Sequence, residues 1–225
     1  MWCIAELDAD YIRKMEDVLR VYEQPYKPAE PVLCLDEKPI TLHADVRPVV
    51  AAAPGKIAKR DNEYKRCGTA NVFCAVEPKR GRHFIRVTPN RSGPEFAQAV
   101  EQVIRAYPFA RRIHLVMDNL STHQRKSLTA RFGQQQGGYL WNRLKLHYTP
   151  KHGSWLNQAE IEISLFSRQC LGHRRIPDLP TLQREAQAWS QRMNLDSVKI
   201  DWQFTRKDAR AKFRYESPLS RRSRT

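Results

Sequence analysis

Apolar side chains recur at helical spacing at the start of the chain, between Leu7 and Tyr22. Intervals of three and four residues predict an amphipathic helix there. Three prolines follow within residues 25–31. Proline blocks helix continuation, so this segment is predicted to be a stiff linker, and the main body of the protein is expected to begin near residue 32.

Short apolar or alternating stretches further along the chain predict strands, and two of them end in an aspartate. Asp36 follows the first strand, where the polar residues 36–39 predict an exit turn, and Asp118 follows a later one. A polar turn at 78–81 predicts a hairpin. The predicted strands are residues 32–35, 71–76, 83–87, 113–117 and 144–148.

Helical periodicity fills most of the remaining chain. The predicted helices cover residues 94–107, a segment ending near Phe132, and residues 155–171 and 181–193. Strands that alternate with helices in this way predict an α/β protein with a mixed sheet covered by helices. The order of elements is most similar to the ribonuclease H-like, retroviral-integrase-like arrangement.

The pattern divides the chain into three parts. Residues 1–31 are predicted to be a helix plus a Pro-rich linker, residues 32–195 a catalytic-type domain, and residues 196–225 a basic C-terminal tail. The tail from residue 203 onward holds eight Lys or Arg and two acids, so it is predicted to be mobile and to seek phosphates. A second basic segment, between residues 46 and 68, is predicted to be a loop.

The charge of the whole chain points to a polyanionic partner. Lys and Arg number 39 against 24 Asp and Glu, which gives 39 − 24 = +15, and nucleic acid is the first expectation. The sequence has no long apolar run for a membrane and no secretory signal, so a cytoplasmic protein is expected. Five cysteines without CxxC spacing predict neither a disulfide framework nor a zinc finger.

Carboxylates are the residues that suggest chemistry. Asp36 and Asp118 would lie together if their strands are neighbours, because sites in α/β sheets lie beyond strand C-termini. A third carboxylate from the helix over 155–171 would complete a site for a hard ion such as Mg²⁺. Glu160 and Glu162 are both available, and periodicity alone leaves the choice between them open.

Three segments around these acids resemble the acid motifs of DDE transposases, in the bacterial insertion-sequence branch of the mariner superfamily. They are Val32-Leu-Cys-Leu-Asp-Glu-Lys-Pro39, His114-Leu-Val-Met-Asp-Asn-Leu-Ser-Thr-His123 and Pro150-Lys-His-Gly-Ser-Trp-Leu-Asn-Gln-Ala-Glu160. The resemblance selects Glu160 over Glu162. It implies metal-dependent DNA cleavage and strand transfer, with Asp36, Asp118 and Glu160 holding two Mg²⁺ or Mn²⁺ ions. It also implies double-stranded DNA partners, TA-containing targets and a dimer or larger complex.

The resemblance has two departures. Only 35 residues precede Asp36, whereas family members carry helix-turn-helix modules ahead of that acid, so an end-recognition half is expected to be missing. Asp118 and Glu160 are separated by 41 residues, a longer interval than is typical, and residues 134–138 are predicted to be the loop that absorbs the excess. The alternative function is a truncated remnant that binds DNA without cutting it.

Basic and aromatic residues are the candidates for DNA contact. His123 and His152 lie near acid motifs, and Trp155 could stack on an unpaired base or belong to the core. Glu37 and Asp45 are predicted to be solvated or structural. The full set of predicted DNA-contacting residues is Lys56, Lys59, Arg60, Lys65, Arg66, His123, Lys151, His152, Trp155, Arg206, Lys207 and Arg210.

Overall fold

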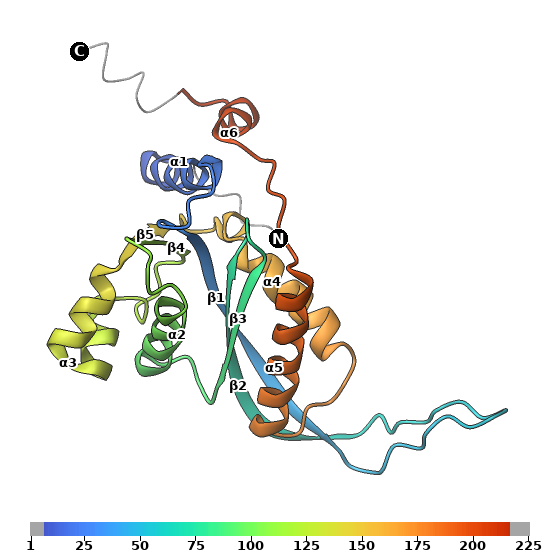
Figure 1. Cartoon of the computed structure of the whole chain (residues 1–225). Coiled ribbons are helices and arrows are strands. Elements are labelled where there is room, and N and C mark those ends of the chain that lie inside the picture. Colours follow the sequence, from blue (N-terminus) through green and yellow to red (C-terminus); the bar gives the residue numbers. More distant parts are fainter. Residues whose placement is uncertain (1–6, 217–225) are drawn as a thin grey trace, which may run out of the picture.

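A mixed five-stranded sheet forms the centre of the protein, in the order β3-β2-β1-β4-β5 (Figure 1). The computed structural model describes residues 7–216. β1, β2 and β3 are antiparallel neighbours, whereas β4 and β5 run parallel to β1. This confirms the predicted α/β class. The strands are β1 (Val32–Asp45), β2 (Tyr64–Glu77), β3 (Arg82–Thr88), β4 (Ile113–Met117) and β5 (Leu144–Tyr148).

Helices cover both faces of the sheet. One face carries α2 and α3, and the other carries α1, α4 and α5 (Figure 1). Successive side chains of a strand point to opposite faces, so Leu33 and Leu35 pack on the α2 side while Cys34 packs beneath α1. The helices are α1 (Ala9–Glu23), α2 (Gly93–Arg105), α3 (Arg125–Asn142), α4 (Ala159–Phe166), α5 (Leu179–Asp196) and α6 (Arg206–Phe213).

The first strand is much longer than its apolar run. The predicted turn at residues 36–39 was wrong, because β1 continues through it in antiparallel register with β2, from Cys34 opposite Val76 to Asp45 opposite Tyr64. Pairing with β4 ends at Cys34. Beyond that point β1 has a strand partner on one side only, so Pro39, which lacks an N–H, is tolerated in it.

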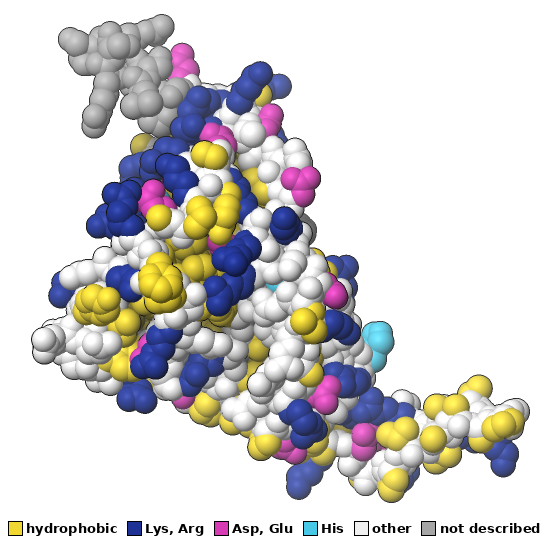
Figure 2. All heavy atoms as spheres, in the orientation of Figure 1, with side chains coloured by type: hydrophobic (Ala, Val, Ile, Leu, Met, Phe, Trp, Pro, Cys, Tyr) yellow, Lys and Arg dark blue, Asp and Glu magenta, His cyan; other side chains and the backbone are white. Residues whose placement is uncertain are grey.

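Residues 46–63 form an extended arm between β1 and β2 that projects away from the body (Figures 1 and 2). Isolated bridges join its two sides, Val50 to Lys59 and Ala53 to Lys56. Gly55 supplies the positive φ of 74° at the tip. Ile57 is 80% exposed. The predicted basic loop is therefore a ribbon with apolar as well as basic side chains.

Two predictions about helices are corrected. The helix expected over 155–171 is broken into a 3₁₀ turn, η1 (Ser154–Leu156), then α4, then a π-helical turn, η2 (Ser167–Leu171). Asn157 makes the first break, with an extended backbone at φ −83° and ψ 107°. The predicted loop at 134–138 is helical, because α3 continues past a kink at Gly133.

The described part of the predicted mobile tail contains an ordered helix, α6. Thr205 and Asp208 form a capping box that starts α6. Arg210 binds Glu16 of α1 through two 2.7 Å hydrogen bonds, which fasten α6 to α1. The last three arginines of the tail, Arg221, Arg222 and Arg224, lie outside the described residues. Among the helices within residues 7–216, none is long and apolar enough to cross a membrane.

Candidate active site

The strand register brings the first two acids to the same place. β1 and β4 pair in parallel up to Cys34 opposite Val116. Asp36 and Asp118 each come two residues after that last pair, so the register extended by two residues sets them opposite each other. Equivalent positions on neighbouring strands point to the same face of a sheet. Because β4 ends at Met117, the sheet opens at these two acids.

Asn157 ties the third acid motif to the first. Its side-chain amide donates to the Leu35 carbonyl at 2.9 Å and to a carboxylate oxygen of Asp36 at 3.2 Å. The backbone carbonyl of Asn157 accepts a hydrogen bond from the backbone N–H of Glu160 at 3.0 Å. The extended break at Asn157 therefore anchors the first turn of α4, which carries Glu160, beside Asp36.

The two glutamates that the sequence left open have different surroundings. Glu162 is 1% exposed, and its Oε1 lies 2.7 Å from Nδ1 of His83 on β3. The other ring nitrogen of His83 lies 3.0 Å from the carbonyl oxygen of Val198. Glu160, in contrast, is exposed. Glu162 is thus a core residue directed toward β3, which leaves Glu160 as the glutamate available to the site.

The charges of the acids act on one another. Burial raises the pKa of Asp36 to about 7, and the negative charges of Glu160, Glu37 and Asp118 add to the rise. A raised pKa means that the ionised form of Asp36 is disfavoured until a positive charge arrives. The clustered carboxylates therefore favour the binding of a cation.

His123 joins two acids inside the protein. Its Nδ1 lies 2.6 Å from Oδ1 of Asp118, its Nε2 lies 3.3 Å from Oε2 of Glu37, and its ring stacks on Phe96. Burial would lower the pKa of His123, but bonding to Asp118 and Glu37 raises it to about 9. Burial would likewise raise the pKa of Asp118, yet the bond from His123 brings it below its usual value.

This arrangement corrects the view of His123 as a surface DNA contact, because its side chain is 1% exposed. It also brings in Glu37, which the sequence predicts to be solvated or structural. The Glu37 side chain is 5% exposed, and its Oε2 is paired with Nε2 of His123 at the long distance of 3.3 Å. The alternation of side chains along a strand could have identified it, because it turns Glu37 to the face of β1 opposite Asp36, the face that packs against α2.

The residues fit a divalent metal by donor chemistry. Mg²⁺ and Mn²⁺ take carboxylate oxygens, and Asp36, Asp118 and Glu160 supply them. Within residues 7–216, no three His, Cys, Asp or Glu side chains are already arranged as ligands around one point. The fit therefore rests on the convergence of charge at Asp36 rather than on a closed ligand shell.

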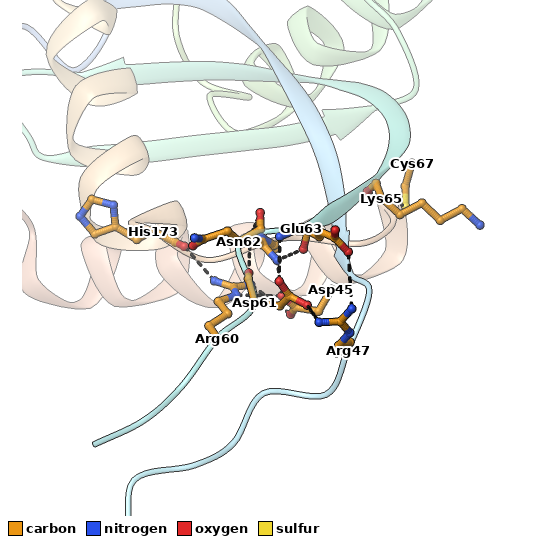
Figure 3. Close-up of polar contacts among 10 residues, drawn as sticks. Asp45, Arg47, Arg60, Asp61, Asn62, Glu63, Lys65, Cys67 and His173 are labelled. Atoms are coloured by element: carbon orange, nitrogen blue, oxygen red, sulfur yellow. Dashed lines mark hydrogen bonds and ion pairs between the residues drawn. The ribbon is translucent and has the colours of Figure 1, made fainter. Parts of the chain in front are cut away.

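Three of the predicted DNA-contacting arginines are paired with carboxylates of the protein itself. Arg60 holds Asp45 with both its Nε and Nη2, at 2.8 and 3.1 Å, at the base of the arm (Figure 3). Arg175 binds the same aspartate at 2.8 Å. Asp45 is thus structural, as expected. Arg206 and Arg210 are likewise paired, with Glu23 and Glu16.

Other predicted contacts remain open to solvent. All eight of these residues are exposed, and neither the lysines nor Arg66 has an acidic partner among the residues that the structure describes. Trp155 is 39% exposed, so it lies partly outside the core. Figure 2 shows Lys and Arg side chains gathered over α1 and α6 at the top of the view. The exposed set is Lys56, Lys59, Lys65, Arg66, Lys151, His152, Trp155 and Lys207.

Comparison with known proteins identifies the family and supports the fold. A family model described as DDE superfamily endonuclease matches residues 31–183. The Mos1 strand transfer complex matches with a TM-score of 0.51 at 12% identity, covering 90% of this chain and 66% of that chain. The catalytic domain of Mos1 mariner transposase matches with a TM-score of 0.47 at 12% identity, covering 89% and 100%.

The chain thus spans about two-thirds of the length of the Mos1 chain in the strand transfer complex. No curated protein matches the sequence. The structural match, together with the mixed sheet flanked by helices, confirms the predicted ribonuclease H-like fold.

Proposed function

Because this chain belongs to the DDE superfamily endonuclease family, we propose that it is the catalytic part of a DNA transposase. It cuts DNA at the ends of a mobile element of the bacterial insertion-sequence type and joins the freed 3′ ends to target DNA. The observation that supports this proposal is the parallel register of β1 and β4, whose last pair is Cys34 and Val116, with Asp36 and Asp118 each following two residues later.

Asp36, Asp118 and Glu160 would hold two divalent ions, Mg²⁺ or Mn²⁺. When bound, such ions activate a water or 3′-hydroxyl and stabilise the leaving oxygen of a phosphodiester. The chain's own residues orient the carboxylates: Asn157 holds Asp36 by its side-chain amide, and protonated His123 holds Asp118 at 2.6 Å. No covalent enzyme intermediate is required.

The partner that we infer is double-stranded DNA, as element ends and as a TA-containing target. The exposed lysines of the arm and of α6 would contact phosphates, so affinity should fall steeply with salt while depending little on sequence. The active complex would be a dimer or larger, which pairs two ends. In a bacterial cell the protein would be cytoplasmic and would associate with the nucleoid when bound to DNA.

The test is metal-dependent cleavage and strand transfer by the Asp118→Asn variant. With Mn²⁺ and a duplex carrying the element's ends, we expect the variant to lose nicking and strand-transfer products while its fold and salt-dependent DNA affinity stay unchanged. Asp196→Asn is the matched control, because Asp196 is exposed at the end of α5, outside the site.

Undiminished products from Asp118→Asn would refute the assignment of the site. Salt-dependent DNA binding by the unaltered chain with no metal-dependent product would favour the remnant that binds DNA without cutting it. Cleavage without strand-transfer product would identify a nuclease of another kind.

A further inference from the structure

A solvent-open cavity lined by aromatic rings includes Trp155, which precedes the third acid motif's Glu160 by five residues. Its volume is about 420 Å³, which is within the usual size range of small-molecule sites. We call it the aromatic pocket, and its lining residues are Trp155, Trp202, Phe204, Lys212 and Phe213. Two distant segments build it: the turn before α4 and the chain around α6.

Ring contacts and hydrogen bonds hold the aromatic pocket in shape. Trp155 meets Phe204 edge-on with centroids 5.5 Å apart and Phe213 at 6.2 Å. The indole N–H of Trp155 donates to the hydroxyl of Tyr11 at 3.2 Å, and that of Trp202 donates to the Phe204 carbonyl at 2.7 Å. The rings are therefore preorganised while Trp155 stays 39% exposed.

Positive charge lies at the rim of the aromatic pocket. Lys212 Nζ is 5.9 Å from the centroid of Phe204. Arg210 is occupied by Glu16, but Lys207, Lys212 and Arg214 are exposed without an acidic partner among residues 7–216. A lining of aromatic rings with a cationic side chain at its edge suits a ligand that joins a flat ring to a phosphate.

The aromatic pocket is close to the acids along the chain. Trp155 is five residues before Glu160, and Asn157 between them touches Asp36. Five residues span at most about 17 Å even when fully extended. Successive nucleotides of one strand are about 3.4 Å apart in B-DNA. A strand held at the acids therefore reaches the pocket within about five nucleotides.

We propose that the aromatic pocket binds an unpaired nucleobase of the DNA strand that lies at the acids, with Lys212 on its phosphate. This inference rests on the proposed DNA-processing function, and it names a second contact for the same substrate. A paired base presents its edges and not its faces, so the aromatic pocket distinguishes tailed or frayed ends from intact duplex.

The test measures binding without divalent metal, so it is independent of cleavage. Affinity is compared between a blunt duplex and the same duplex with about five unpaired nucleotides, one of them 2-aminopurine. We expect tighter binding and fluorescence quenching for the tailed duplex. The preference should persist at high salt, because stacking is not screened as phosphate contacts are.

The Phe213→Leu and Trp155→Leu variants should reduce that preference by between about fivefold and about a hundredfold, the equivalent of one stacked base. Phe109→Leu is the matched control, because Phe109 is 96% exposed and lies outside the pocket. Lys212→Ala removes an exposed side chain, and it should weaken binding of the tailed duplex while the protein stays folded.

Equal affinity for blunt and tailed duplex in the unaltered protein would overturn the proposal. A preference retained by Phe213→Leu, Trp155→Leu and Lys212→Ala would overturn it equally, and it would assign the pocket to another occupant such as a protein segment. Because no metal is present, such a failure is separate from any loss of cleavage in Asp118→Asn.

Discussion

Two glutamates in α4, Glu160 and Glu162, should give opposite results when each is changed to alanine. Glu162 is buried against His83, with Oε1 2.7 Å from Nδ1 and both side chains 1% exposed. Removing one partner of a buried pair leaves the other desolvated and unpaired, which costs about 3–5 kcal/mol. For a chain of this length, each kcal/mol lowers the Tm by about 2–4 °C.

Glu162→Ala should therefore lower the Tm by about 6–20 °C. Glu160 is exposed in the first turn of α4. Removing its carboxylate loses a favourable interaction with the helix dipole of about 0.3–1 kcal/mol. The same change relieves the repulsion between the charges of Glu160 and Asp36, which offsets part of that loss. The Tm of Glu160→Ala should therefore change by only a few degrees at most, while metal-dependent cleavage disappears.

The assay is thermal unfolding of both variants followed by circular dichroism, together with cleavage measured well below each Tm. Glu162→Ala should keep cleavage activity wherever it is folded. The reasoning fails if Glu160→Ala is destabilised as much as Glu162→Ala. It fails also if the folded Glu162→Ala protein is inactive while Glu160→Ala still cuts.

Three further predictions concern acid stability, DNA contact and packing. Burial lowers the pKa of His114 to about 4, against 6.5 for the free group. Below pH 6.5 the unfolded chain binds the proton more readily than the folded chain, so the free energy of unfolding should fall between pH 6.5 and pH 4. Urea titrations should show a smaller fall for the His114→Gln variant. Lys59→Ala should reduce the salt slope of DNA binding by about one, whereas Arg60→Ala, whose guanidinium is held by an aspartate, should leave it unchanged in anisotropy titrations. A Cβ at Gly137 would lie 2.4 Å from the backbone carbonyl oxygen of Leu128, whereas a Cβ at Gly138 would meet only the end of the Arg125 side chain, at 3.1 Å. Gly137→Ala should therefore lower the free energy of unfolding by about 1–3 kcal/mol, and Gly138→Ala by much less. Equal urea midpoints for the two variants would contradict this.

The pH prediction for His114 reflects a buried relay that joins α1 to the sheet. His114 Nδ1 lies 2.9 Å from His147 Nε2, and His147 Nδ1 lies 2.6 Å from Asp17 on α1. Burial would raise the pKa of Asp17, but bonds from His147 and Arg20 lower it to about 2. The Asp17 contribution should therefore persist above about pH 4 and be lost as the pH falls toward 2.

Local patterns in the sequence determined most of the elements. Apolar runs and helical spacing report burial over a few residues, which is why the strands at 113–117 and 144–148 and the helices near 94 and 181 were predicted closely. The same runs marked Asp36 and Asp118 as strand-end acids. These are near-neighbour properties, so they can be read without knowledge of the partner segments.

Only the tertiary structure decided what those residues touch. β1 extends to Asp45 because β2 pairs with it, and Glu162 is buried because His83 faces it from β3. Arg60 is paired with Asp45 across the base of the arm in the same way. Each outcome depends on register and packing between segments far apart in the chain, and the periodicity of one segment carries no information about its distant partner.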